Sequence, residues 1–149
     1  MTAPALAVSS VDDRPAVRTS PLPASTLLGL ARRGLAEAAG PEQHPTERYA
    51  LAHLAALRGA AAVLACRARP APPARRSRPT SAWVLLTQVA PELGEWATFF
   101  AAGARKRAAA EAGLPAVTAR EADDLLRDAE AFLAVVEAVV PGQLLLASG

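Results

Sequence analysis

The stretch E-R-Y-A-L-A-H-L-A-A-L-R-G-A-A-A-V-L-A, residues 47–65, decides the fold class. Alanine and leucine fill most of its positions, and both residues favour the α-helix. Thr46 precedes it as a capping residue, and Glu47 places a negative charge in the first turn, where the helix dipole stabilises it. The stretch therefore predicts one long helix that ends near Arg67.

Four residues of this helix, Arg48, Tyr49, His53 and Arg58, carry polar chemistry. His53 follows Tyr49 by one helical turn, which favours a packing histidine whose ring hydrogen-bonds a neighbouring helix. A ligand-binding or catalytic His53 is the alternative, although a lone histidine lacks the convergent partners of a site. We expect Arg48 and Arg58 to be solvated or paired with acidic side chains.

Two further helical patterns lie on either side of this helix. The first begins with Ser25 or Thr26 as N-cap and stops at Gly40. The second, residues 82–112, has an apolar stripe that passes across Pro91. Since proline interrupts the hydrogen bonds of a helix, this segment predicts either one kinked helix or two helices.

The last pattern is a long amphipathic helix. Thr118 and Glu121 have the spacing of a capping box, and apolar residues then repeat at the helical period up to Val140. No segment shows the sustained alternation of a strand. The sequence predicts an all-α bundle of four to five helices over residues 24–140.

Proline-rich segments interrupt or flank this bundle. We expect residues 1–23 to be a disordered N-terminal segment and residues 68–79 to form a Pro/Arg-rich loop inside the bundle. Residues 141–149 are expected to be a C-terminal tail.

Composition and charge are those of one globular domain. The 149 residues are 52% hydrophobic and 20% charged, with a net charge of +2. Residues 67–80 contain five arginines and no acidic residue. The rest of the chain therefore has 11 of the 16 basic residues and all 14 acidic ones. The body is mildly acidic and one loop is strongly basic: Arg67, Arg69, Arg75, Arg76 and Arg78.

Cellular location follows from what the sequence does not contain. Cys66 is the single cysteine, which excludes a disulfide within the chain. The N-terminus lacks the features of a signal peptide, and Arg58 and Glu137 break the two most apolar runs. We expect a cytoplasmic protein that does not enter a membrane.

Basic residues offer a candidate nucleic-acid site. Together, the consecutive cations of residues 105–107 and the arginine-rich loop can form a phosphate-binding surface. The alternatives are an ion pair between Arg107 and Glu111, with the other cations solvated, and a loop that only improves solubility. The candidate residues are Arg105, Lys106, Arg107, Arg75, Arg76 and Arg78.

Acidic residues do not predict a metal site. Asp123, Asp124 and Asp128 have no histidine or cysteine beside them, and Asp123 stands four residues before Arg127, the order that favours an ion pair within a helix. The sequence also lacks phosphate-binding loops and zinc-ligand spacings. We therefore expect no metal and no cofactor.

Three segments together resemble a known family. Residues 47–65 resemble the signature helix of the HEPN (higher eukaryotes and prokaryotes nucleotide-binding) domains, and R-E-A-D-D-L-L-R-D-A-E-A-F-L-A-V-V-E, residues 120–137, resembles their closing helix. With E-W-A-T-F-F-A-A-G-A-R-K-R-A-A-A-E-A-G, residues 95–113, the chain is most similar to a HEPN subfamily of high-GC actinobacteria. The resemblance covers about residues 25–140.

This resemblance implies a helical bundle that often dimerises. In many members it also implies RNA cleavage without a metal by an arginine followed, after four to six residues, by a histidine. Arg48 and His53 have this spacing. On a regular helix, however, residues five apart point about 140° away from each other.

The predicted function is therefore non-catalytic. We expect a homodimer that binds or scaffolds RNA, a nucleotide or a protein partner in nucleic-acid-related processes, and we predict no catalytic site. One alternative is a toxin-like, metal-independent ribonuclease that uses Arg48 and His53. Another is a protein-interaction bundle that docks a partner on the side of Trp83, Trp96 and Phe100 and does not contact nucleic acid.

Overall fold

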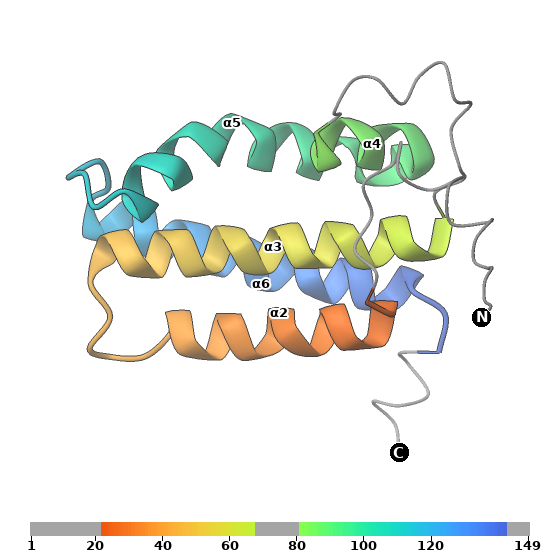
Figure 1. The fold of residues 1–149 in the computed structure, drawn as a ribbon, viewed down its shortest axis with the longest axis horizontal. Coiled ribbons are helices and arrows are strands. Elements are labelled where there is room, and N and C mark those ends of the chain that lie inside the picture. The colour runs from red at the N-terminus through yellow and green to blue at the C-terminus, as the bar shows by residue number, and fades with distance from the viewer. Residues whose placement is uncertain (1–21, 68–80, 143–149) are drawn as a thin grey trace, which may run out of the picture.

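The computed structural model describes residues 22–67 and 81–142 of the chain. Every regular element in these two ranges is helical, which confirms the predicted all-α bundle (Figure 1). Most of the predicted disordered segment 1–23, the loop 68–79 and most of the tail 141–149 lie outside these ranges. The elements are α2 Ala24–Ala38, α3 Pro45–Arg67, α4 Ala82–Val89, the 3-10 helix η2 Pro91–Leu93, α5 Gly94–Glu111 and α6 Ala119–Val139.

Helix α3 is the centre of the bundle. It contacts α2, α4, α5 and α6, and Figure 1 shows α4 and α5 on one side of it, α2 on the opposite side and α6 behind. By length and composition alone α3 is apolar enough to cross a membrane, but 56% of its most apolar window is buried in the bundle. Its hydropathy is therefore accounted for by its place in the core.

Small residues let the helices approach closely. The buried alanines of α3, such as Ala52 and Ala60, have no exposed surface. A Cβ atom added at Gly59 of α3 would lie 3.1 Å from Cδ1 of Leu133 on α6. Because core side chains pack at the density of organic crystals, the contact between α3 and α6 leaves little room for a larger residue at Gly59.

Four aromatic rings fill the space between α4, α5 and α6. Trp83 stacks on Phe100 with ring centroids 5.2 Å apart, and Phe100 and Phe132 are 5.1 Å apart. Trp83 is 5% exposed and Phe100 is not exposed at all, whereas Trp96 is half-buried. The predicted docking side of Trp83, Trp96 and Phe100 is therefore wrong, because two of its three residues belong to the core.

Pro91 separates two helices, which decides between the two interpretations of residues 82–112. α4 ends at Val89, and Ala90 leaves the helical region with φ −140° and ψ 72°. A following proline disfavours the helical conformation in the residue before it, so Ala90 cannot continue α4. Pro91 then opens η2, and the chain continues directly into α5.

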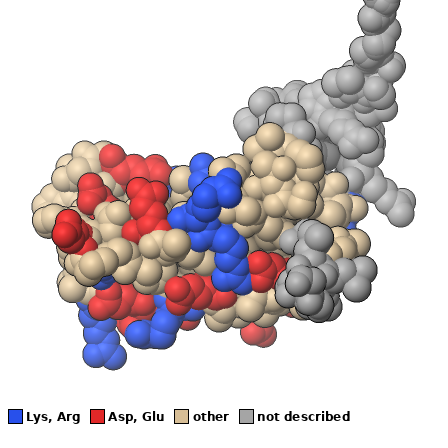
Figure 2. Space-filling view, turned by 90° about the horizontal axis from the view of Figure 1, so that it is seen from below, with Lys and Arg blue, Asp and Glu red and all other residues tan. Residues whose placement is uncertain are grey.

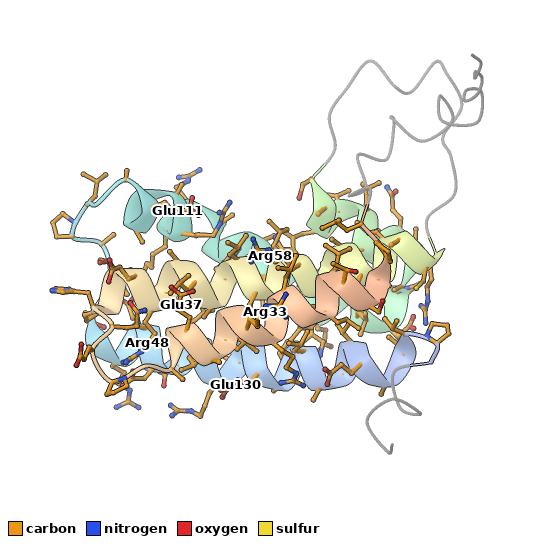
Figure 3. All side chains as sticks on the ribbon, turned by 60° about the horizontal axis from the view of Figure 1, so that its bottom comes forward. Arg33, Glu37, Arg48, Arg58, Glu111 and Glu130 are labelled. Carbon is orange, nitrogen blue, oxygen red and sulfur yellow. The ribbon has the colours of Figure 1, made fainter. Side chains whose placement is uncertain are left out.

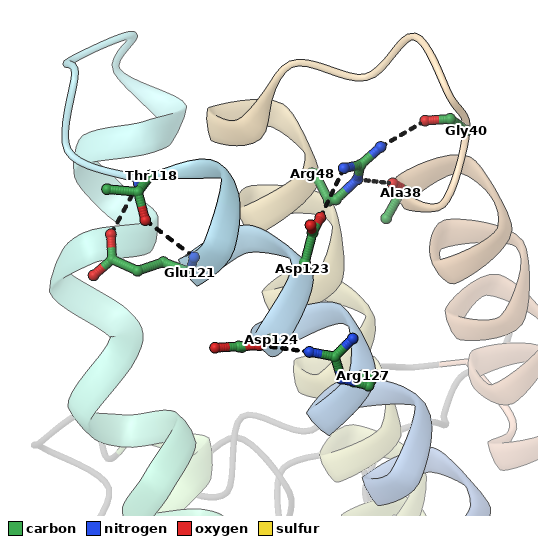
Figure 4. Close-up of polar contacts among 8 residues, drawn as sticks. All are labelled: Ala38, Gly40, Arg48, Thr118, Glu121, Asp123, Asp124 and Arg127. Carbon is green, nitrogen blue, oxygen red and sulfur yellow. Dashed lines mark hydrogen bonds and ion pairs between the residues drawn. The ribbon is translucent and has the colours of Figure 1, made fainter.

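The capping residues explain where two of the helices begin. The backbone N–H of Trp83 donates to Oγ of Ser81, so Ser81 caps α4. Thr118 and Glu121 form the predicted capping box of α6, each side chain accepting a hydrogen bond from the backbone N–H of the other (Figure 4). Gly113, with φ 81°, adopts the left-handed conformation just after α5.

Two predicted helix starts are wrong by two or three residues. α2 begins at Ala24, and its N-cap is Pro23 rather than Ser25 or Thr26. The carbonyl of Pro23 already accepts a hydrogen bond from the N–H of Leu27, which places both candidates in the first turn. α3 begins at Pro45 rather than after Thr46, since proline fits the first position of a helix, where no N–H is needed.

Candidate functional site

His53 lies in the interior and faces α5. Its Nε2–H donates to the backbone carbonyl of Phe100 at 2.8 Å, and the residue is 1% exposed. Its ring stacks with Tyr49, centroids 6.5 Å apart, and meets the rings of Trp83 and Phe100 edge-on at 6.0 and 5.8 Å. These contacts are those of a packing histidine bonded to a neighbouring helix.

The hydrogen bond between His53 and the carbonyl of Phe100 shows which nitrogen of the imidazole carries the proton. A carbonyl oxygen only accepts, so Nε2 carries the proton and Nδ1 is unprotonated. Nδ1 has no hydrogen-bond partner among the described residues. Burial lowers the pKa of His53 below its ordinary value; the bond to Phe100 opposes this shift, and the charge of Arg107 adds to it. His53 is therefore neutral at pH 7.

Gly103 makes this arrangement possible. It lies on α5, where an added Cβ atom would be 2.9 Å from Oη of Tyr49 and 3.5 Å from Cδ2 of His53. Only a residue without a side chain allows α5 to approach these rings so closely. Gly103 was not predicted from the sequence. The available signal was a glycine inside an otherwise good helix, which is unfavourable unless packing requires it.

Arg48 is held by three groups on the other side of α3. Its Nε and Nη2 donate to the carbonyls of Ala38 and Gly40, each at 2.8 Å, and its Nη1 donates to Oδ1 of Asp123 at 2.9 Å (Figure 4). The side chain is 17% exposed. Arg48 thus caps the C-terminal end of α2 and links it to α6.

Arg48 and His53 do not come together in this chain. Arg48 contacts the end of α2 and the start of α6, whereas His53 contacts α4 and α5. This separation agrees with the divergence expected for residues five apart on a helix. Both side chains use their polar atoms to hold helices together.

The predicted ion pair between Asp123 and Arg127 is wrong. Asp123 accepts from Arg48 instead, and Arg127 donates to Asp124 at 2.5 Å (Figure 4). The packing of α3 against α6 brings a fixed guanidinium to Asp123, and this contact replaces the local pair within the helix. No group of three or more His, Cys, Asp or Glu side chains that could hold a metal occurs in the described part of the chain.

Two of the three consecutive cations of α5 are paired with acidic residues. Arg107 donates to Glu111 at 2.7 Å, as predicted from their spacing, and Lys106 donates to Glu121 of α6 at 2.5 Å. Arg105 is exposed. Figure 2 shows basic and acidic side chains interleaved on the face viewed from below. The other candidate cations, Arg75, Arg76 and Arg78, lie outside the described residues.

A groove of about 750 Å³ opens beside the N-terminal half of α3. Figure 3 places Glu37 of α2 and Glu111 of α5 at the same end of the bundle as this groove. Its walls combine carboxylates with half-buried leucines: Glu37, Glu47, Glu111, Leu51 and Leu54 are among the lining residues. Glu111 is paired with Arg107, whereas Glu37 and Glu47 make no ion pair among the described residues. These two carboxylates repel phosphate, so the groove does not suit a nucleic-acid backbone.

The lowered pKa of His53 predicts a pH-dependent stability. Above about pH 6.5, the ordinary pKa of histidine, neither state protonates His53, and its contribution to stability is complete. As the pH falls below this value, the unfolded chain binds a proton that folded His53 rejects, so the free energy of unfolding decreases. Urea unfolding between pH 7.5 and 5.5 measures this loss. His53→Gln, which has no titrating ring, should lose less over the same range; equal losses would contradict the assignment.

Comparison with known proteins adds the family. A family model described as SAV_6107-like HEPN matches residues 36–137, from the end of α2 through most of α6. No curated protein and no solved structure gives a significant match. The match covers more than half of the chain and includes both Arg48 and His53, and it confirms the resemblance inferred from the sequence. The chain therefore belongs to the HEPN family, in its SAV_6107-like group.

Proposed function

We propose that this HEPN chain acts by binding a partner in nucleic-acid-related processes and does not cut RNA. The observation that supports this most is the position of His53, 1% exposed with its only ring proton donated to the carbonyl of Phe100. A general base must reach the proton that it removes and needs a pKa near the working pH. Burial denies His53 both properties.

The contacts of Arg48 support the same proposal. A ribonuclease needs a cation close to the phosphate as negative charge develops on it. The guanidinium of Arg48 already donates to two backbone carbonyls and to Asp123, and it leaves 17% of the side chain exposed. A substrate phosphate would have to break these bonds before Arg48 could assist it.

Within residues 22–67 and 81–142, the charge pattern favours a protein partner over RNA. Lys106 and Arg107 form ion pairs with Glu121 and Glu111, and the groove beside α3 also carries the unpaired carboxylates of Glu37 and Glu47. Phosphate binding requires cations that are free to release counterions. We further propose, from the family resemblance and the composition, that the chain is a cytoplasmic homodimer.

An RNA cleavage assay in EDTA tests the proposal. We expect no cleavage by the wild-type chain above the level of a mock purification, since neither candidate residue is available for the reaction. His53→Gln and Arg48→Ala, checked for folding by circular dichroism, are the matched variants. Cleavage by the wild type that disappears in a folded His53→Gln variant would show that the chain is a metal-independent ribonuclease.

A further inference from the structure

A small cleft opens between α5 and α6, away from Arg48 and His53. The two helices meet through the ion pair of Lys106 with Glu121 and through the rings of Trp96 and Phe132, whose centroids are 5.5 Å apart. Beside this aromatic contact lies a cleft of about 310 Å³. Its described lining consists of two aromatic and two acidic residues: Glu95, Trp96, Phe99 and Asp128.

The aromatic lining is exposed yet firmly held. Phe99 is 45% exposed, whereas the next residue, Phe100, is completely buried. The ring of Phe99 meets Phe100 edge-on at 5.0 Å, and Trp96 stacks on Phe100 at 6.2 Å. Contacts with the core therefore restrict both rings before any ligand binds. A ligand that covers them would lose less binding free energy to the ordering of side chains.

The two acidic residues of the lining have no close polar partner among the described residues. In the described structure neither Glu95 nor Asp128 makes a hydrogen bond or an ion pair. By contrast, the nearby Asp124 accepts from Arg127, and Asp123 accepts from Arg48. Asp128 is half-buried, and its burial, together with the charge of Asp124, raises its pKa, although the charge of Arg127 opposes this shift. A cation placed in the cleft would offset both of these unfavourable effects.

We propose that this cleft binds an arginine side chain of a partner protein. Its guanidinium would lie against the rings of Trp96 and Phe99 while donating hydrogen bonds to Asp128 and Glu95. Arginine suits this lining because its flat guanidinium stacks on aromatic rings and donates to carboxylates in a planar fork. A phosphate would be repelled by both carboxylates, and an apolar side chain would desolvate them without compensation.

The inference rests on the proposed function, since it names the chemistry of the partner that a binding bundle would recognise. The two can nevertheless fail separately. RNA cleavage would overturn the binding role without affecting a titration of the cleft, and an inert cleft would leave the account of His53 untouched.

Nuclear magnetic resonance of the ¹⁵N-labelled full chain tests the cleft with N-acetyl-arginine amide as the probe. We expect the indole N–H resonance of Trp96 to shift in a saturable way, while that of Trp83, 5% exposed in the core, stays in place. The neutral isostere N-acetyl-citrulline amide should cause no such shift. Asp128→Asn and Phe99→Ala, confirmed as folded by circular dichroism, should each weaken the arginine response about fivefold.

Three results would overturn the inference. The first is an unchanged Trp96 resonance at saturating concentrations of the arginine probe. The second is an equal response to the citrulline probe, which would mean that the charge is not recognised. The third is an undiminished response in both folded variants, which would place the binding elsewhere on the chain.

Discussion

Replacement of Phe100 by alanine is expected to lower the free energy of unfolding by about 3–5 kcal/mol. Phe100 has no exposed surface and contacts the rings of Trp83, Trp96, Phe132 and His53, so its removal leaves a cavity where α3, α4, α5 and α6 meet. The backbone carbonyl that accepts from His53 remains, which limits the change to lost packing. Urea unfolding monitored by circular dichroism measures the loss.

Phe99→Ala is the matched control, since it removes the same ring from the adjacent position. Phe99 is 45% exposed, and we expect this substitution to change the free energy of unfolding by no more than about 1 kcal/mol. Equal losses for the two variants would contradict the assignment of Phe100 to the centre of the core.

Arg48→Ala is expected to lower the free energy of unfolding by about 1.5–3 kcal/mol. The substitution removes both hydrogen bonds to the C-terminal end of α2, and the carbonyls of Ala38 and Gly40 lose a charged donor. The pair with Asp123 adds little to this figure, because Asp123 is 52% exposed and water screens its charge. Thermal or urea unfolding of the purified variant gives the value.

Arg58→Ala controls for the general loss of an arginine from the same helix. Arg58 is half-buried and makes no ion pair or hydrogen bond within residues 22–67 and 81–142, so we expect a loss below about 1 kcal/mol. Equal losses in the free energy of unfolding for Arg48→Ala and Arg58→Ala would contradict the assignment of Arg48 as the cap of α2. The guanidinium of Arg48 would then be free to contact a substrate phosphate.

Local signals in the sequence predicted most of the helices. The capping box of Thr118 and Glu121 and the break at Pro91 both act within a few residues, and the structure has each of them. The start of α2 was misjudged because its N-cap, Pro23, makes no side-chain capping bond, whereas Ser25 and Thr26 just after it are good capping residues. The true start therefore carries no capping signal in the sequence.

Long-range contacts were less predictable. The pairing of Asp123 with Arg48 depends on how α3 lies against α6, and the need for Gly103 depends on the position of α5 along α3. The placement of Trp83 and Phe100 in the core has a physical reason that the sequence analysis overlooked. In a chain with many alanines, the few large rings must fill the space that the small side chains leave.

For the candidate site, the helical spacing of Arg48 and His53 already predicted that the two side chains point apart. Arg48 and His53 keep the arginine–histidine interval seen in the nucleases that the family resemblance suggests, yet each contacts different helices. The acceptor of the His53 proton could not be predicted from the sequence, because it is the backbone carbonyl of Phe100 and every residue has such a carbonyl.

The central claim is that His53 is a neutral packing residue, and ¹⁵N-detected titration of its ring tests this most directly. We predict that His53 keeps one protonated nitrogen, Nε2, and one unprotonated nitrogen, Nδ1, as the pH falls from 7.5 through 6.5, because burial lowers its pKa. A ring that gains its second proton at or above pH 6.5 would contradict the account. It would show His53 accessible to solvent and suited to act as a general base.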